Sequence, residues 1–343
     1  MTPPPATRAR ILPEIPRARQ PSWRAALQQA VTDPAELLNL LELGPELLPA
    51  ARQAAALFPL RVPRGYVARM HKGDPRDPLL LQVLPLAAEL DAAPGFGRDA
   101  VGDLPSARGD GVLQKYRGRA LLITTGACGV HCRFCFRRHF PYADHTAARA
   151  GWQPALERVA ADTSLEEVIL SGGDPLSLSD RRLAELTDQL DGISHLKRLR
   201  IHTRQPVVLP ERVDAELLAW LGRGRLQKIV VIHANHAHEL DRAVALAMRA
   251  VATTGATLLN QSVLLRGVND SVAALRDLSQ RLFACGVLPY YLHLLDRVQG
   301  SAHFEVPESS ARELHHALAA ELPGYLVPRL VREEPGQPGK TLL

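Results

Sequence analysis

The sequence predicts an α/β fold in which a parallel sheet carries helices on its outside. From residue 115 onward, short apolar runs alternate with amphipathic stretches, and this alternation is typical of consecutive strand–helix units. Six such units are too few for a complete eight-stranded barrel. The apolar runs cover 120–124, 167–170, 198–202, 228–233, 257–265 and 287–295. The amphipathic stretches lie near 154–162, 179–190, 214–221, 238–253, 271–284 and 307–320.

The residues before this core predict helices followed by irregular chain. Asp33-Pro34 is a helix start signal with proline at the first helical position, and leucines follow it at helical spacing. Helices are therefore expected from residue 22 to about 70, and the stretch 71–114, rich in Gly, Pro and Asp, is expected to be irregular.

The predicted organisation has four parts. Residues 1–24, with five arginines against one acid and many prolines, read as a flexible basic arm. Residues 25–114 form the helical and irregular region, 115–325 the core, and 326–343 a C-terminal segment.

Composition limits the class of protein. The chain has 343 residues, 46% of them hydrophobic and 22% charged, which suits one large or two smaller globular domains. No apolar run is long enough to span a bilayer, and no nucleic-acid-binding motif accompanies the net charge of +5. Four cysteines, three of them clustered, indicate a reducing cytoplasm.

The clustered cysteines are the most informative feature of the chain. Cys128, Cys132 and Cys135 have a C-x3-C-x2-C spacing, and three thiolates on one loop can hold three irons of a 4Fe–4S cube. The fourth iron is then free to bind a substrate or cofactor. Cys285 lies in an apolar stretch and is expected to be a buried, reduced thiol.

Two other interpretations of the cysteines compete. A zinc site would need a fourth ligand, which His131 or His139 could offer, but zinc motifs usually pair cysteines in two C-x2-C units. A disulfide framework would need an oxidising compartment and a small fold.

The cysteine loop and the turn that follows the next strand together resemble the radical S-adenosylmethionine (SAM) superfamily. That turn is Ser171-Gly172-Gly173-Asp174-Pro175. The resemblance implies a partial (β/α)6 barrel of the triosephosphate isomerase (TIM) type, a 4Fe–4S cluster on the three cysteines, and SAM at the open iron. It also implies that Gly172, Gly173 and Asp174 hold the methionyl amino group of SAM.

Further segments narrow the resemblance to the lysine 2,3-aminomutases. They include Lys115-Tyr116-Arg117-Gly118-Arg119, Arg200-Ile201-His202-Thr203-Arg204, His233-Ala234-Asn235-His236 and Asn260-Gln261-Ser262-Val263-Leu264-Leu265-Arg266-Gly267. The family also uses pyridoxal phosphate (PLP), which needs a lysine for a Schiff base. The resemblance implies that Lys340 is this catalytic lysine and that the C-terminal segment is a tail carrying it. It further implies that Lys115, Tyr116 and Arg119 bind the PLP phosphate, with additional cofactor contacts from His233 and Gln261.

Three charged residues match the family's substrate-binding residues. The resemblance implies that Arg137 pairs with the carboxylate of L-lysine and that Asp296 holds its ε-ammonium. The family's second aspartate for this ammonium corresponds to Glu333, with Glu334 adjacent. Acidic residues around the end of the substrate side chain argue against a glutamate aminomutase, which would need a cation there.

The chain stops three residues after Lys340, whereas free-lysine aminomutases run well beyond their PLP lysine. The short form resembles the branch that makes (R)-β-lysine for translation elongation factor P, to which a ligase of lysyl-tRNA-synthetase type attaches it. The resemblance also implies a reductant such as flavodoxin or ferredoxin. Neither nucleic acid nor a membrane is expected as a partner, and the sequence leaves open whether the protein forms a homo-oligomer. The alternatives are a catabolic aminomutase of free lysine, a radical SAM enzyme without PLP, and a non-catalytic iron–sulfur or zinc protein.

Overall fold

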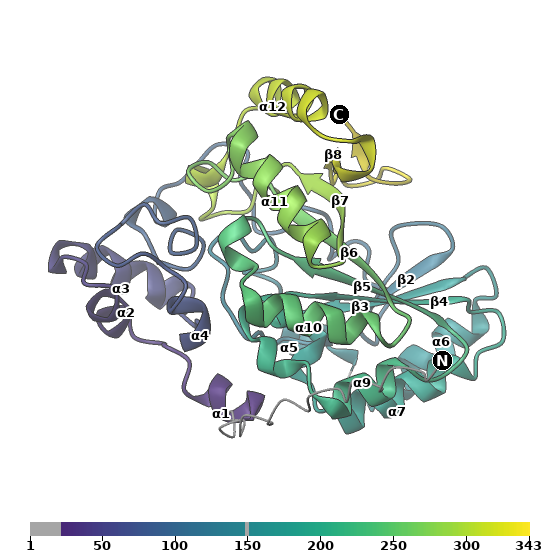
Figure 1. Ribbon diagram of the computed structural model, residues 1–343. Helices are drawn as coiled ribbons and strands as arrows, with labels where there is room; N and C mark the ends of the chain where they lie inside the picture. The colour runs from purple at the N-terminus through teal and green to yellow at the C-terminus, as the bar shows by residue number, and fades with distance from the viewer. Residues whose placement is uncertain (1–21, 148–150) are drawn as a thin grey trace, which may run out of the picture.

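The computed structural model describes residues 22–147 and 151–343, and in this part of the chain one nine-stranded sheet forms the centre (Figure 1). The strand order follows the chain. β2 to β8 pair in parallel, while β1 and β9 pair antiparallel at the two edges. The strands are β1 (Val112–Leu113), β2 (Arg119–Thr125), β3 (Glu167–Gly172), β4 (Arg198–Thr203), β5 (Gln227–His233), β6 (Thr257–Val263), β7 (Leu288–His293), β8 (Arg329–Arg332) and β9 (Thr341–Leu342).

A long helix follows each strand from β2 to β7, so the six strand–helix units predicted from the sequence are present. The α/β fold with a parallel sheet is therefore confirmed. The α-helices are α1 (Trp23–Gln28), α2 (Pro34–Leu40), α3 (Leu48–Leu57), α4 (Arg64–Val67), α5 (Tyr142–His145), α6 (Gln153–Ala161), α7 (Asp180–Asp191), α8 (Gln205–Val208), α9 (Ala215–Leu221), α10 (Arg242–Ala252), α11 (Val272–Ala284) and α12 (Glu308–Glu321).

Helices start where a short polar side chain can accept a hydrogen bond from the first turn. Asp214 accepts one from the Leu217 amide at 2.9 Å, ahead of α9, and Ser271 accepts one from the Ala274 amide at 3.2 Å, ahead of α11. These caps pair amide groups that the helix itself leaves without acceptors.

The main core lies between the sheet and its helices. Leu183, Leu186 and Leu190 of α7 recur at helical spacing, and all three are fully buried with Leu199 and Ile201 of β4. The periodicity of α7 thus places one apolar face on the alternating buried residues of the strand.

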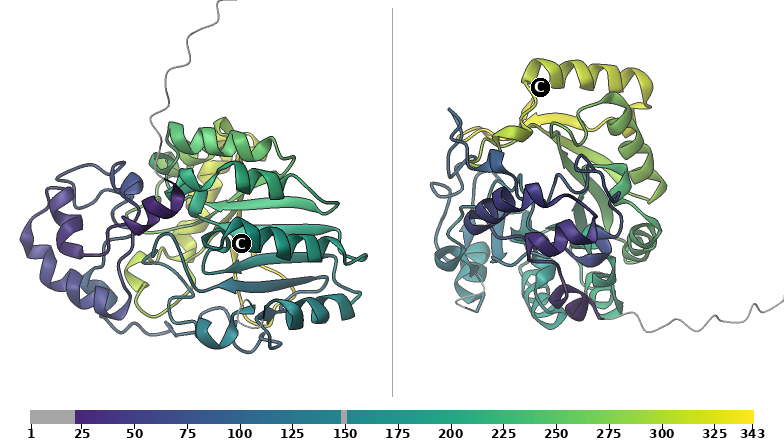
Figure 2. Two further views of the ribbon diagram at one scale, coloured as in Figure 1. Left: turned by 90° about the horizontal axis from the view of Figure 1, so that it is seen from below. Right: turned by 90° about the vertical axis from the view of Figure 1, so that its left-hand side faces the viewer.

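The N-terminal helices gather at one end of the sheet (Figures 1 and 2) and form a second core against the cysteine loop. Val130 of that loop is buried in this second core. Arg133 has no exposed surface, and its guanidinium donates to both carboxylate oxygens of Glu89, at 2.8 and 2.6 Å. The N-terminal region therefore holds the cysteine loop in place. Residues 1–21 of the basic arm predicted over residues 1–24 lie outside the part of the chain that the structure describes.

The C-terminal segment, predicted as a tail that carries Lys340, ends in two short strands. β8 and β9 form an antiparallel hairpin with Arg332 facing Thr341, and β8 extends the parallel sheet beside β7. The Gly- and Pro-rich residues 334–339 make the turn of this hairpin, in which Gly336 has φ of +83°. No helix in the described part of the chain has both the length and the apolar character that a bilayer crossing requires.

Candidate active site

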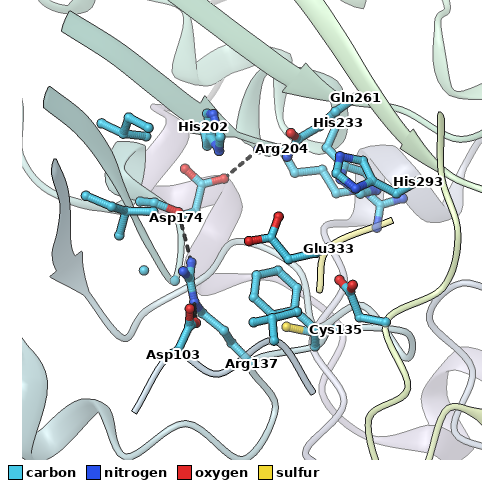
Figure 3. Close-up of a pocket in the computed structure, with 18 of the residues that line it drawn as sticks. Asp103, Cys135, Arg137, Asp174, His202, Arg204, His233, Gln261, His293 and Glu333 are labelled. Atoms are coloured by element: carbon cyan, nitrogen blue, oxygen red, sulfur yellow. Dashed lines mark hydrogen bonds and ion pairs between the residues drawn. The ribbon is translucent and has the colours of Figure 1, made fainter. Parts of the chain in front are cut away.

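One cavity of about 300 Å³ lies at the carboxyl ends of the parallel strands (Figure 3), a size suited to a bound small molecule. Strand ends and loops that are far apart in sequence meet there, because parallel strands present their carboxyl ends at one edge of the sheet. The residues that the sequence analysis singled out for cofactors and substrate all line it: Lys115, Tyr116, Arg119, Cys128, Cys132, Cys135, Arg137, Gly172, Gly173, Asp174, His233, Gln261, Asp296, Glu333 and Lys340.

The three cysteines follow β2 and crowd one part of the cavity. Burial, and after it the neighbouring Cys135, Asp174 and Cys132, raises the pKa of Cys128 well above its usual value. Burial likewise raises the pKa of Cys135 to about 11. Thiolates crowded in this way repel one another, and a cationic group bound between them removes that cost. Three thiols on one loop at the wall of the cavity fit an iron–sulfur cluster.

One thiol already has a cationic neighbour. Arg204 donates from one guanidinium nitrogen to the Cys132 sulfur at 2.7 Å. Its other terminal nitrogen donates to Glu239 at 2.9 Å and Gln82 at 2.6 Å, and the side chain is only 7% exposed. A fixed positive charge therefore sits beside a predicted cluster ligand.

The two histidines considered as zinc ligands are engaged elsewhere. The His131 Nδ1 lies 2.9 Å from the Pro59 carbonyl oxygen, and the His139 Nε2 lies 3.2 Å from the Gln299 carbonyl oxygen. Within the described residues, no three His, Cys, Asp or Glu side chains are arranged so that they could all ligate one single metal ion.

The two glycines after β3 let the cysteine loop approach closely. A Cβ atom on Gly173 would lie 2.4 Å from the Ala127 carbonyl oxygen, and one on Gly172 would lie 2.7 Å from the Thr125 carbonyl oxygen. Gly172 also has φ of +117°, which L side chains rarely adopt. The amide of Gly173 donates to the Thr125 carbonyl oxygen at 2.7 Å. The glycines thus join the cysteine loop to the end of β3.

Asp174 joins the ends of β3 and β4. Its carboxylate accepts four hydrogen bonds, from the amides of Leu176, Arg204 and Gln205 and from the Thr203 hydroxyl, at 2.7 to 3.0 Å. The contact with a ligand ammonium that the sequence predicts would compete with these donors.

A buried ion triad links two predicted binding residues through a residue that the sequence analysis missed. Asp103 accepts from Arg137 Nε at 2.7 Å and pairs with Lys115 Nζ at 2.7 Å, while Arg137 also donates to the Ser171 hydroxyl at 3.0 Å. Burial raises the pKa of Asp103, but the charges of Arg137 and Lys115 outweigh it and hold that pKa below its usual value. Asp103 comes from the irregular stretch 71–114, where no local pattern indicates its role.

The predicted PLP lysine lies on the C-terminal hairpin. Lys340 forms an ion pair with Glu333, whose other carboxylate oxygen accepts from the Tyr116 hydroxyl at 2.6 Å. Lys340 Nζ also lies 5.8 Å from the centre of the Tyr291 ring. Burial raises the pKa of Glu333, but Lys340, Tyr116 and Lys115 outweigh it and hold the pKa below its usual value.

Asp296 is a second acid in the same cavity, and its surroundings are different. It follows β7, and no hydrogen bond or ion pair reaches its carboxylate from the rest of the described chain. Burial, partly offset by Lys340, raises the pKa of Asp296 to about 7. A partly buried carboxylate without a hydrogen-bond partner is a ready site for an ammonium group.

Comparison with known proteins identifies the family, although no family model matches the chain. The chain is 51% identical over 322 residues to the L-lysine 2,3-aminomutase of Escherichia coli (strain K12), covering 94% of both chains. It is 46% identical to the L-lysine 2,3-aminomutase of Haemophilus influenzae, and the match covers 97% of this chain and 99% of that one. It is 31% identical to the L-lysine 2,3-aminomutase of Clostridium subterminale, and the match covers 97% of this chain and 80% of that one. The chain belongs to the L-lysine 2,3-aminomutase family. The predicted class, an isomerase, is thereby confirmed.

A solved radical SAM methyltransferase from Sphaerobacter thermophilus is also similar, at 18% identity over 64% of this chain and 68% of that one. The TM-score of 0.45 is too low to carry an argument about fold or function.

This member of the lysine 2,3-aminomutase family has two cavity histidines beyond His233 that the sequence analysis did not assign. Burial lowers the pKa of His233 to about 3 and that of His202 and His293 well below the usual value, so all three rings are neutral. Within the described residues, the Nε2 atoms of His233 and His293 are buried without a hydrogen-bond partner. Each can take a polar atom of a bound ligand.

Proposed function

We propose that this chain is a radical SAM, PLP-dependent L-lysine 2,3-aminomutase that moves the amino group of (S)-α-lysine from C2 to C3, giving (R)-β-lysine. The observation that carries the proposal is the convergence, in one cavity, of three cluster-spaced thiols, one lysine amine and an unpartnered carboxylate. The open nine-stranded sheet, with its cavity lined from successive strand ends, supports a partial (β/α)6 barrel.

The first group of residues would hold the cluster and SAM. Cys128, Cys132 and Cys135 would hold three irons. The loop of Gly172, Gly173 and Asp174 lies against the cysteine loop, and would face SAM together with the unpartnered His233 Nε2 and with Gln261. When bound, the cluster, SAM and PLP supply the electron, the radical and the carrier of the migrating amine.

The second group would hold PLP. Lys340 would bind it covalently through the ε-amine. Lys115, Tyr116 and Arg119 would bind the phosphate dianion. The Arg119 guanidinium lies 4.9 Å from the centre of the Tyr116 ring and lines the same cavity as Lys115.

The substrate would lie between Arg137 and Asp296. Arg137 has five N–H donors and uses its Nε on Asp103 and one N–H on Ser171, which leaves donors for the lysine carboxylate. Asp296 would receive the ε-ammonium. The two ends of lysine are thus bound by opposite charges, which fixes the carbon that faces the radical.

The product would serve the modification of elongation factor P. The chain is 51% and 46% identical to two relatives that it covers over 94% and 99% of their length, against 31% for the Clostridium subterminale enzyme. This proximity supports the short branch of the family over free-lysine catabolism. In cells lacking the gene, elongation factor P should lose the mass of its β-lysyl group, and added (R)-β-lysine should restore it. An unchanged mass would favour catabolism.

The reaction is tested with anaerobically reconstituted protein, lysine, SAM, PLP and a flavodoxin or ferredoxin as reductant. We expect β-lysine to form and Cys132→Ala to lose both iron and SAM cleavage. Cys285→Ala is the matched control, because Cys285 is a buried thiol at the end of α11 and does not line the cavity. Lys340→Arg keeps the charge but should lose the PLP absorbance. Absence of β-lysine from a protein that binds both cofactors would refute the proposal.

A further inference from the structure

Asp103 occupies the centre of the ion triad at the wall of the cavity, beside Arg137 (Figure 3). Its side chain is only 2% exposed, and its two carboxylate oxygens contact different cations. Oδ2 accepts from Arg137 Nε at 2.7 Å, and Oδ1 lies 2.7 Å from Lys115 Nζ. Loss of one member of a buried ion pair leaves the other as an uncompensated charge, so the place of each cation depends on Asp103.

The backbone around Asp103 is fixed by a turn of the irregular stretch. The amides of Asp103 and Leu104 donate to the two carboxylate oxygens of Asp99, at 2.9 and 3.0 Å. The Ser106 amide donates to the Asp103 carbonyl oxygen at 3.1 Å. Since hydrogen bonds hold the chain on both sides of Asp103, its carboxylate extends into the cavity wall from a defined position.

The Arg137 guanidinium is held at two of its nitrogens. Nε donates to Asp103, Nη1 donates to the Ser171 hydroxyl at 3.0 Å, and the group lies 4.8 Å from the centre of the Phe136 ring. A guanidinium pairs with a carboxylate either through Nε and one terminal nitrogen or through its two terminal nitrogens. Asp103 takes Nε, so a ligand carboxylate is left with the terminal nitrogens and meets them in one orientation.

We propose that Asp103 is a positioning residue, which fixes the Arg137 guanidinium so that the lysine carboxylate is received at one place in the cavity. The assignment rests on the proposed function, in which Arg137 binds that carboxylate. Asp103 does not contact the substrate and acts through Arg137. The place of the carboxylate sets the place of C3, and a displacement of about 1 Å at the reacting carbon costs much of the rate.

The charge of Asp103 and its position have opposite effects on the binding of a carboxylate. Its negative charge repels the carboxylate of the substrate, so the loss of this charge alone would strengthen binding. The loss of the anchor has the larger effect, because a buried guanidinium without its counter-ion leaves its place for water or another acceptor. Each carboxylate that binds must then order the long Arg137 side chain again, which weakens binding.

The test compares three ligands that differ at their two ends. Norleucine is lysine with a hydrogen in place of the ε-amino group, and cadaverine is lysine with a hydrogen in place of the carboxylate. Each is titrated into the cluster- and PLP-loaded protein, and the change in PLP absorbance reports the replacement of Lys340 by the ligand amine. In Asp103→Ala, the concentration for half-maximal change should rise about tenfold for lysine and norleucine and stay unchanged for cadaverine, which has no carboxylate for Arg137.

Asp110→Asn is the matched control and should change none of the three titrations. Asp110 is an acid of the same irregular stretch, but it pairs with Arg158 at 3.5 Å on the surface and does not line the cavity. Its φ of +55° is one that asparagine tolerates.

Two further variants keep the test decisive if Asp103→Ala does not fold. Asp103→Glu keeps the charge but displaces the carboxylate, so it should raise the lysine and norleucine values by less. Ser171→Ala removes the second hydrogen-bond partner of Arg137 and should act in the same direction, again without an effect on cadaverine.

The outcomes separate this assignment from the proposed function. An equal rise for all three ligands in the Asp103 variants would show that Asp103 only supports the fold. Unchanged or lower values for lysine and norleucine would show that Asp103 does not position Arg137. Either result overturns the assignment while the aminomutase proposal stands. If wild-type protein neither captures PLP nor responds to lysine, the proposed function fails and the assignment fails with it.

Discussion

The unpartnered carboxylate of Asp296 should make lysine binding depend on pH. Burial raises its pKa to about 7, so below pH 7 the ligand-free cavity holds mostly the protonated acid. Lysine keeps its ε-ammonium throughout, since that pKa is about 10.4, and a protonated carboxyl must lose its proton before the ion pair can form. We therefore expect the lysine concentration for half-maximal binding to rise about tenfold for each pH unit below the midpoint of this ionisation and to be flat above it.

The charge of the nearby Lys340 influences the pH at which this dependence begins. Lys340 lowers the pKa of Asp296 in the ligand-free protein, so the midpoint should move upward when PLP binds Lys340 as proposed and the lysine charge no longer acts on Asp296. The assay is the absorbance titration of PLP-loaded protein with lysine between pH 5.5 and 8.5, with norleucine as the control for every titration other than that of Asp296. Asp296→Asn should abolish the difference between the two amino acids. A lysine requirement that is flat across this range, or that norleucine reproduces, would refute the reasoning.

The same carboxylate should reduce stability at neutral pH. In the unfolded chain Asp296 ionises near pH 3.9, whereas the folded protein retains the proton up to about pH 7. Stability therefore falls as pH rises between these values and stays lower above pH 7. Asp296→Asn should leave urea unfolding of the ligand-free protein unchanged near pH 4 and stabilise it at pH 8 by up to about 4 kcal/mol. A gain of the same size at both pH values would contradict this cause.

Two further predictions concern the cluster. Gly173→Ala should lower iron content, because the new Cβ would lie 2.4 Å from the Ala127 carbonyl oxygen and displace the cysteine loop, whereas Gly339→Ala, with no atom within 4 Å, should keep it. Arg204→Lys should shift the reduction potential of the cluster to more negative values in a spectroelectrochemical titration, since it weakens the contact of a fixed positive charge with Cys132. An unchanged potential would show that the contact does not influence the cluster.

The sequence predicted the strand–helix units and the set of cavity residues well, and the reason is topological. Residues such as Cys128, Asp174 and Asp296 follow different strands, and parallel strands bring their carboxyl ends together whatever the lengths of the intervening helices. The family resemblance singled out these residues, and the parallel strands bring them into one cavity.

Features that depend on long-range packing were not predictable in the same way. Asp103 lies in irregular chain, and only the folded position of that chain brings it within 2.7 Å of both Arg137 and Lys115. The C-terminal hairpin was missed because β8 and β9 are four and two residues long, too short for a strand period to be visible. The Gly- and Pro-rich turn between these two strands sets the register of Lys340.

Asp296 and Glu333 are both carboxylic acids of the cavity, but their surroundings shift their pKa values in opposite directions. Glu333 lies opposite Lys340 in the hairpin and has its pKa lowered, while Asp296 follows β7, has no partner, and has its pKa raised to about 7. Two acids whose surroundings push their pKa values apart are suited to different tasks. Glu333 carries a permanent charge that the protein itself neutralises, whereas Asp296 becomes fully ionised at neutral pH only when a cation arrives. A substrate with a second ammonium supplies that cation, and the electrostatics of the cavity thus favour a dibasic amino acid over a neutral one of the same length.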